Sequence, residues 1–369
     1  MNSKNVCFGV LMIANALMLS VAIAAPVREG ERVVRDPNTG DYTAYYLDDE
    51  ADGVEMIESP LITATKIDPR VRSVFTLIQN LNVRYVYKIS NGHAAKLPIS
   101  DISFVGLPAN VAISNSIVAS GNGNADRIEF FESALSVPNK NWYGSGARLS
   151  KELNIGWHYN NETFNTSLGI QPGETLSGFG IISTDLPGVL GAHLIGNTKF
   201  HQFDFSGEGP DPSKTDIARQ MQVIEQNDFV LRNIAAPLVI VPNPYDAAIV
   251  LDRIRTHVAT WLGKQLLDPA YAAQLDRYIG SAADAYRRNE PKAGREQIEA
   301  LRKMLDHEHK YLDHDDEDND DTPEHKAATR LTIDRLAARV LDFDLRYVLK
   351  RMEKEHEQDH DEGDRKKGR

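Results

Sequence analysis

The sequence predicts an α+β protein with two ordered parts: an antiparallel, immunoglobulin-like β-sandwich over residues 61–241, followed by a small α-helical bundle over residues 242–305 and 323–355. Three observations lead to this prediction. Short apolar runs with a two-residue period, separated by Gly- and Asn-rich turns, fill the first part, as is typical of a sandwich. Pro242 and Pro244 then end the strand pattern, because proline cannot pair in a central strand. After them the apolar period changes to about 3.6, which indicates amphipathic helices.

The N-terminal segment has the layout of a secretory signal peptide over residues 1–24. Lys4 precedes an apolar run that ends in small residues, as such signals do. An uncleaved membrane anchor is the alternative, because the run is nearly long enough to cross a bilayer. The only cysteine, Cys7, lies in this segment, so the cleaved protein would have neither disulfides nor thiolate ligands. We therefore expect a secreted, periplasmic or envelope protein without a transmembrane segment after cleavage.

Strand patterns follow a polar N-terminal segment over residues 25–60, which is either a lead or an extra strand. The stretch NVRYVYKIS alternates apolar and polar side chains, so one strand face is expected to be buried, and it carries Val83, Tyr85, Tyr87 and Ile89. A turn at Pro172-Gly173 is expected to precede a strand that carries Leu176, Phe179 and Ile181. This turn and strand resemble an element of immunoglobulin-like bacterial domains, which supports the fold and identifies no ligand.

Capping residues mark the starts of the helices. Asp246, Asp268-Pro269, Pro291 and Thr322-Pro323 each stand where an amphipathic pattern begins. The predicted inward faces contain Val250, Ile254, Val258 and Trp261, then Tyr271, Leu275, Tyr278, Ile279 and Ala282, then Ile298, Leu301, Met304 and Leu305, and finally Leu331, Leu336, Val340, Phe343, Tyr347 and Met352. Residues 356–369 form a charged tail that we predict to be disordered, because almost no apolar residue occurs there.

The helical part is similar to a known kind of module. The runs AAQLDRYIGSAADAYRRNEPKAGREQIEALRKMLDHEHK and AATRLTIDRLAARVLDFDLRYVL resemble the FIVAR and FIMAH modules at the C-terminal ends of bacterial exported proteins. The resemblance covers residues 246–355 approximately and rests on the spacing of Leu275, Ala282, Ala285, Asn289, Ala293, Leu301, Leu331 and Leu336. An acidic insert departs from the family pattern. The resemblance implies an extracellular accessory or interaction module and supplies no catalytic residue.

Charge and motifs argue against several classes of function. The formal net charge of −12 disfavours a nucleic acid partner. No nucleophile elbow, Walker loop or HExxH motif occurs, and Gly144-Ser145-Gly146 lacks the outer residues of the elbow. Half of a dinucleotide fingerprint, Gly121-Asn-Gly-Asn, is better explained as a hairpin turn between strands. We therefore expect a protein that is not an enzyme.

Aromatic residues supply the ligand candidates of the sandwich. Trp142 and Tyr143 follow a predicted loop and could stack on the apolar face of a sugar. Trp157 and Tyr159 share one face of a strand, so we interpret them as core residues. Four histidines occur singly and are interpreted as surface or hydrogen-bonded residues rather than ligands, namely His93, His158, His193 and His201.

An acidic, His-rich insert over residues 306–322 supplies the metal candidates. Candidate ligands in and beside it are His307, His309, Asp313, His314, Asp315, Glu317, Asp321 and His325, for which calcium and zinc are the candidate ions. The spacing from Asp313 fits a calcium loop in part, but Asp318 stands where that loop needs glycine. A solvated linker is the alternative, because such a run of carboxylates repels itself.

Together these observations predict an exported binding or structural protein that recognises a surface protein or a glycan through the loops of its sandwich. The helices would be an accessory module, and no cofactor is required. Two alternatives stay open. One is the binding of divalent metal by the acidic insert, and the other is a carbohydrate-binding or carbohydrate-active role.

Overall fold

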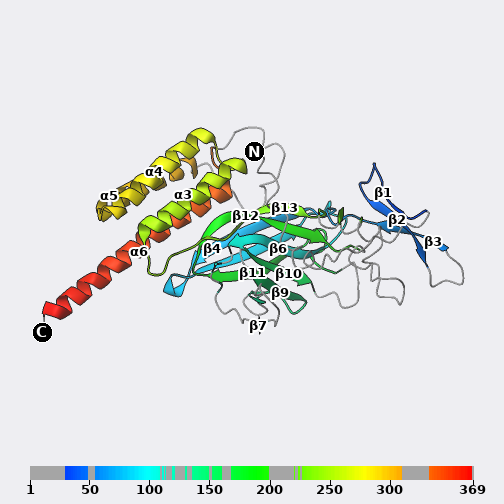
Figure 1. The fold of residues 1–369 in the computed structure, drawn as a ribbon, viewed down its shortest axis with the longest axis horizontal. Coiled ribbons are helices and arrows are strands. Elements are labelled where there is room, and N and C mark those ends of the chain that lie inside the picture. The colour runs from blue at the N-terminus through cyan, green and yellow to red at the C-terminus, as the bar shows by residue number, and fades with distance from the viewer. Residues whose placement is uncertain are drawn as a thin grey trace, which may run out of the picture. The chain divides into compact units, whose positions relative to one another are not determined.

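The computed structural model describes residues 30–48, 55–108, 135–148, 152–159, 168–198, 227–309 and 332–367, with the short pieces 110–111, 113, 119–120, 129–130, 220 and 223–224. Within these ranges the chain forms three antiparallel sheets and four α-helices, which confirms the predicted α+β class (Figure 1). The chain divides into two compact units. The first comprises Met1–Val74, Tyr85–Ile182 and Gly191–Ile234, and the second comprises Phe75–Arg84, Ser183–Leu190 and Ala235–Arg369.

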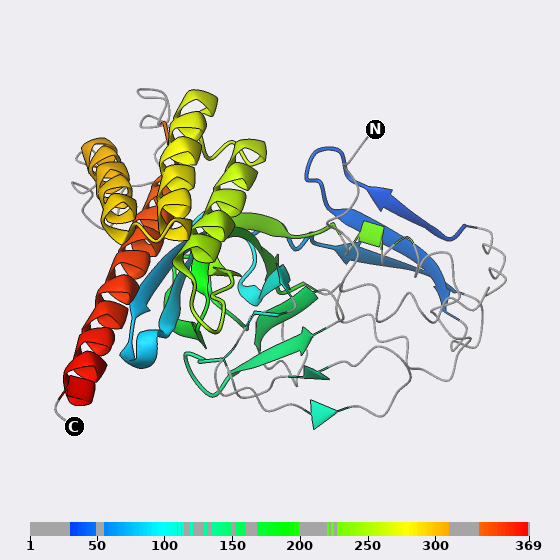
Figure 2. The same cartoon turned by 60° about the vertical axis from the view of Figure 1, so that its left-hand side comes forward.

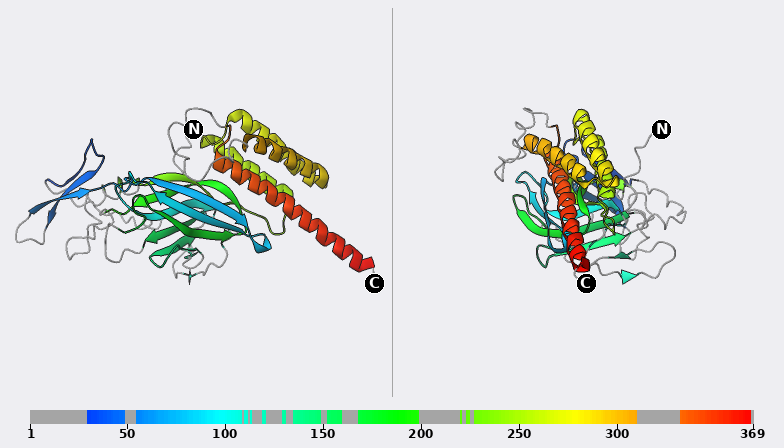
Figure 3. Two further views of the ribbon diagram at one scale, coloured as in Figure 1. Left: turned by 180° about the vertical axis from the view of Figure 1, so that it is seen from behind. Right: turned by 90° about the vertical axis from the view of Figure 1, so that its left-hand side faces the viewer.

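The largest sheet has seven strands. In spatial order they are β13 (Val230–Val239), β12 (Leu186–Gly196), β6 (Ile99–Pro108), β10 (Glu152–Tyr159), β9 (Trp142–Arg148), β8 (Glu129–Phe130) and β7 (Ala119–Ser120). A three-stranded sheet has the order β11 (Thr175–Ser183), β5 (Val83–Asn91) and β4 (Pro69–Leu77), with the short 3-10 helix η1 (Gln79–Leu81) before β5. Figure 3 (left) shows β4 and β5, in light blue, in front of the green strands.

The buried faces of these two sheets meet in an aromatic core. On β5 the predicted alternation is confirmed, since Val83, Tyr85, Tyr87 and Ile89 are all buried. Tyr87 packs edge-on against Phe104 of β6, with 5.0 Å between the ring centroids, and Phe104 packs in the same way against Trp157. Such edge-to-face contacts add to the burial of apolar area. The predicted core position of Trp157 is therefore confirmed.

The turn at Pro172-Gly173 and the strand after it are also confirmed. Gly173 has a φ of +83°, which favours glycine, and its backbone N–H donates to the carbonyl of Asn91 at 2.6 Å. On β11 the side chains of Phe179 and Ile181 are buried, whereas Leu176 is half-buried.

The third sheet lies in the N-terminal lead. Its strands are β1 (Arg32–Arg35), β2 (Tyr42–Asp48) and β3 (Glu55–Leu61), which form an antiparallel meander (Figure 2). On its surface the guanidinium group of Arg32 lies 4.1 Å from the ring centroid of Tyr45. The sequence left open a lead or one extra strand here and did not predict a three-stranded sheet, because charged residues on both sides of these short apolar runs obscure their alternation.

A helix follows each of the four predicted starts, but the last one begins at Arg335 and not at Thr322-Pro323 as predicted, because residues 332–334 are not helical. The helices are α3 (Ala247–Gly263), α4 (Pro269–Arg287), α5 (Pro291–His309) and α6 (Arg335–Lys367) (Figure 2). Asp246 and Asp268 cap the first two, since their carboxylates accept hydrogen bonds from the N–H groups of Ile249 and Ala270. Most predicted inward residues are buried, but Tyr278, Met304, Leu336 and Met352 are half-buried and Leu331 lies outside the described residues.

Two details of the helical part differ from the prediction. The second compact unit does not begin at Pro242, because it also contains strand segments from earlier in the chain. Phe343 of α6, for example, packs edge-on against Phe75 of β4, with 5.2 Å between the ring centroids. Helix α6 continues to Lys367 and extends beyond the other helices in Figures 1 and 3, so the predicted disorder from residue 356 is wrong. Its Glu, Lys, Arg and Gln residues are good helix formers, which compensates for the lack of apolar ones.

None of the helices in the described part of the chain has the length and apolar composition that a bilayer crossing needs.

Candidate functional site

A cluster of polar side chains lies on the outer face of the seven-stranded sheet. His158 on β10 stands opposite Tyr143 on β9 and opposite Asp101 on β6, and Ser145 on β9 stands opposite Gly156. Directly opposed residues point to the same side of a sheet. Trp142 and Trp157, which precede Tyr143 and His158 in their strands, point to the core. Because side chains alternate along a strand, the four polar residues point away from the core. We call Asp101, Tyr143, Ser145 and His158 the His158 cluster.

Hydrogen bonds join three members of the His158 cluster into a line. The His158 Nδ1 atom lies 2.7 Å from Oδ1 of Asp101, and its Nε2 atom lies 3.0 Å from Oγ of Ser145. A carboxylate can only accept, so in the neutral ring Nδ1 carries the hydrogen and Nε2 is the acceptor. The Ser145 hydroxyl therefore donates to Nε2. The second Asp101 oxygen accepts from the hydroxyl of Ser100 at 2.5 Å, which fixes the carboxylate.

A glycine makes room for this line. A Cβ atom at residue 156 would lie 2.9 Å from Nε2 of His158. With glycine at this position, the imidazole can lean over the backbone of β10 toward Ser145, which stands opposite residue 156 rather than residue 158. The identity of Gly156 thus supports the hydrogen bond between Ser145 and His158.

Tyr143 provides an exposed aromatic surface beside the line. Its side chain is 52% exposed, and its ring centroid lies 5.2 Å from that of His158, with 34° between the planes. Partial burial, and secondarily the negative charge of Asp101, raise the pKa of Tyr143 above its ordinary value. The phenol therefore remains protonated at neutral pH and can donate a hydrogen bond.

Trp142, the other aromatic candidate, is a core residue. Only 3% of it is exposed, and its ring packs edge-on against Phe179, with 4.9 Å between the centroids. The prediction of an exposed Trp142 is therefore wrong. The residue begins strand β9, and because side chains alternate along a strand, the exposure of Tyr143 requires Trp142 to face inward.

The other single histidines do not join the His158 cluster. His193 on β12 stacks on Phe229, with 3.9 Å between the ring centroids and 5° between the planes, and burial lowers its pKa. His93 is exposed, whereas His201 lies outside the described residues. Sequence reasoning treated His158 as one of these isolated residues. The available signal was the Gly144-Ser145-Gly146 stretch near a histidine, but nothing local indicated Asp101.

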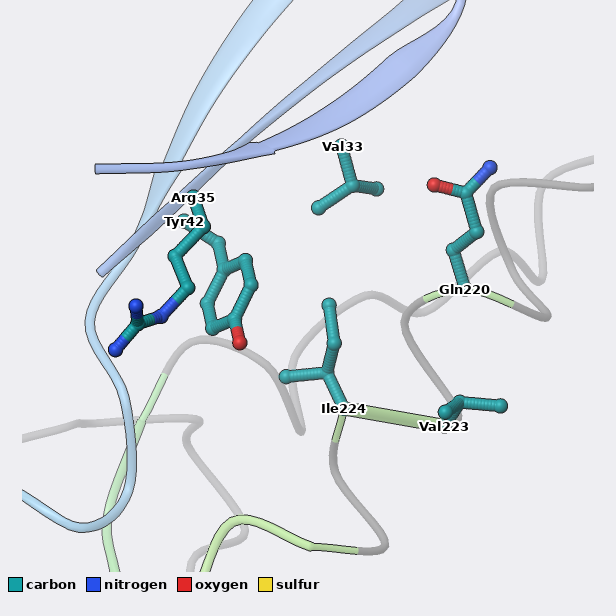
Figure 4. Close-up of a pocket in the computed structure, with 6 residues that line it drawn as sticks. All are labelled: Val33, Arg35, Tyr42, Gln220, Val223 and Ile224. Atoms are coloured by element: carbon teal, nitrogen blue, oxygen red, sulfur yellow. The ribbon is translucent and has the colours of Figure 1, made fainter. Parts of the chain in front are cut away.

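A cavity of about 390 Å³ lies at a second place in the first unit. It is lined by Val33, Arg35, Tyr42, Gln220, Val223 and Ile224. Figure 4 shows the apolar side chains of Val33 and Ile224 facing it, while the guanidinium group of Arg35 points away from them. Apolar groups dominate this lining, and no acid or histidine occurs among the described residues that form it, so the cavity offers less chemistry than the His158 cluster.

The side chains of the metal-ligand candidates lie outside the described residues. His307 and His309 belong to the last turn of α5, but their side chains, and the whole of Asp313, His314, Asp315, Glu317, Asp321 and His325, lie outside the described residues. Within the described ranges, no three or more His, Cys, Asp or Glu side chains gather as a metal site would require. Metal binding by the acidic insert therefore stays a prediction.

Comparison with protein-family models, with curated proteins and with solved structures gives no match. The resemblance of the helical part to FIVAR and FIMAH modules stays a prediction as well.

Proposed function

We propose that this chain is an exported binding protein that recognises a carbohydrate on the outer face of its seven-stranded sheet, at the His158 cluster. The observation that carries the proposal is an exposed aromatic ring, Tyr143, beside a fixed line of hydrogen-bonding groups. An aromatic face suits the C–H face of a sugar, and hydroxyl, imidazole and carboxylate groups suit its hydroxyls.

Preorganisation supports this choice of ligand. Ser100 fixes Asp101, Asp101 fixes the tautomer of His158, and His158 orients the hydroxyl of Ser145. Groups that are already held in place lose little conformational freedom when a ligand binds. The net charge of −12 favours a neutral polyol over an anionic ligand.

The proposed architecture is an immunoglobulin-like β-sandwich with the helices packed as a bundle that acts as an accessory module. The aromatic contacts between β5, β6 and β10 support a two-layer sandwich. Arg255 of α3 forms an ion pair with Asp276 of α4, and Arg302 of α5 forms one with Asp342 of α6, which supports the packing of these helices side by side. Export is proposed from the N-terminal segment of residues 1–24.

Replacement of the exposed ring tests the proposal. A glycan array with the mature protein should identify a ligand, and calorimetry with it should show about fivefold weaker binding for Tyr143→Ala, since one aromatic contact contributes roughly 1 kcal/mol. The matched control is Tyr45→Ala, which removes a surface tyrosine from the N-terminal sheet. Equal affinity of Tyr143→Ala and the unmodified protein for every glycan bound would contradict the proposal.

A further inference from the structure

We infer that Ser145 is a nucleophile and that the His158 cluster hydrolyses acyl esters of hydroxylated ligands, such as O-acetylated sugars. His158 is the base that accepts the proton of Ser145, and Asp101 is a positioning residue that acts through His158. This activity goes beyond binding and uses the same site as the proposed function.

The geometry meets the two requirements for an activated serine. The nucleophile must lie within hydrogen-bond reach of a base, and the base must be oriented by a third group. The distances of 3.0 Å from Ser145 to His158 and 2.7 Å from His158 to Asp101 satisfy both. The direction of the bonds is also correct, because Asp101 forces the proton onto Nδ1 and leaves Nε2 free to act as the base. Ser145 and His158 are both half-buried, so a substrate can reach them.

The reaction balances without a cofactor. Oγ of Ser145 attacks the ester carbonyl carbon while its proton passes to Nε2 of His158. The bond between the carbonyl carbon and the alcohol oxygen breaks, and the alcohol leaves with the proton from His158. Water then attacks the acyl-serine and gives its proton to Nε2, which returns that proton to Oγ as the carboxylic acid departs.

We expect slow turnover. An efficient acyl transferase has preorganised N–H donors for the oxyanion, and loss of one such donor lowers kcat by about 10² to 10³. Here Ser145 lies within a strand, where backbone N–H groups donate to the carbonyls of adjacent strands and are not directed at an oxyanion. The reactivity of the serine itself, rather than the turnover of an ester, is therefore the more sensitive measure.

The experiment is labelling of the full mature chain with a fluorophosphonate, in which Oγ of Ser145 displaces fluoride from phosphorus. Peptide mass spectrometry should find the adduct on Ser145, and Ser145→Ala should remove it. Ser103→Ala is the matched control, because Ser103 lies on the same face of β6, the strand that pairs with β10, and its replacement should leave the labelling rate unchanged. Release of acetate from an O-acetylated sugar should depend on Ser145 in the same way.

Further variants separate catalysis from a structural role. Asp101→Asn and Gly156→Ala should each slow labelling at least tenfold, because the first disturbs the tautomer of His158 and the second its position. His158→Ala should also label slowly, and added imidazole should restore part of the rate, which a merely structural histidine would not show. An adduct that forms no faster than on Ser103, or that persists in Ser145→Ala, would overturn the inference. Binding of the glycan by Ser145→Ala would meanwhile show that the proposed function stands independently.

Discussion

Two histidines of this chain lie in opposite surroundings. His158 is half-buried among polar groups on a sheet face. His257 of α3 belongs to the second unit, where its Nε2 atom accepts a hydrogen bond from the backbone N–H of Val189 at 2.8 Å. Burial, and secondarily the positive charge of Lys264, lower the pKa of His257 to about 4. The carbonyl of Val189 in turn accepts a hydrogen bond from Lys264 at 2.7 Å. Both the N–H and the carbonyl of Val189 in β12 are therefore bonded, one to His257 within α3 and the other to Lys264 directly after it.

This arrangement predicts that acid destabilises the protein through His257. Its folded-state pKa of about 4 lies below the ordinary 6.5, so the unfolded chain gains a proton first as the pH falls. The contribution of neutral His257 to the free energy of unfolding is thus fully present above pH 6.5 and is lost as the pH falls from 6.5 to about 4. This contribution is at most about 3 kcal/mol. His257→Gln retains an acceptor but cannot titrate, so denaturant unfolding across this window should show a smaller pH slope. The exposed His93→Gln should keep the full slope.

At the scale of elements, α6 contains two aspartates with contrasting surroundings. Asp342 is paired with Arg302 of α5 and with Arg346 one turn further along its own helix. Asp344 is only 2% exposed, and its Oδ1 atom has no hydrogen-bond partner among the described residues. Burial raises the pKa of Asp344 well above its ordinary value. Helix α6 therefore packs with a carboxyl group that favours its neutral form.

Removal of this charge should stabilise the protein at neutral pH. Because the pKa of Asp344 is higher in the folded state than in the unfolded state, its contribution to the free energy of unfolding is full below pH 3.8. This contribution is lost as the pH rises through the folded-state pKa. Asp344→Asn is neutral at every pH, so its melting temperature at pH 8 should exceed that of the unmodified protein, and the difference should shrink toward pH 4. Asp342→Asn, the control on the same helix, should instead lower the melting temperature, because it breaks the contacts with both arginines. A less stable Asp344→Asn at pH 8 would refute the argument.

At the scale of the whole molecule, the helices depend on strands that come from distant parts of the chain. The second unit contains Phe75–Arg84 and Ser183–Leu190 besides the helices. Phe75 contacts Phe343 and lies 5.5 Å from the guanidinium group of Arg339, while Val189 binds His257 and Lys264. Those strand segments complete the core of the unit, so the helices do not constitute a full domain.

A fragment of residues 246–369 should therefore be helical but loosely packed. We expect a helical circular dichroism spectrum, a broad thermal transition and binding of a hydrophobic dye, because apolar faces that strand segments cover in the full chain become exposed. The full chain with Phe75→Ala should unfold cooperatively at a slightly reduced temperature, since it loses one aromatic contact. Sharp, cooperative melting of the fragment would contradict this view of the second unit.

Elements that depend on neighbouring residues could be predicted from the order of the amino acids alone. The period of β5, the caps Asp246 and Asp268, and the turn at Pro172-Gly173 were all predicted, because alternation, capping and turn formation act over a few residues. The helical course of α6 beyond residue 356 does not follow from an apolar pattern, because that part has almost no apolar residue and depends on helix propensity alone.

The candidate site and the extent of the second unit depend on contacts between segments that are distant in the chain, so they could not be predicted locally. Asp101 and Ser145 meet His158 across 57 and 13 residues of sequence, because β6, β10 and β9 are adjacent in one sheet. In the same sheet, the side chain of Trp142 is buried in the core and that of Tyr143 is exposed. Strand order and register result from the packing of whole sheets, so they cannot be predicted from the periodicity of a single strand. A hydrogen-bonded line built across three strands therefore becomes visible only after the chain has folded.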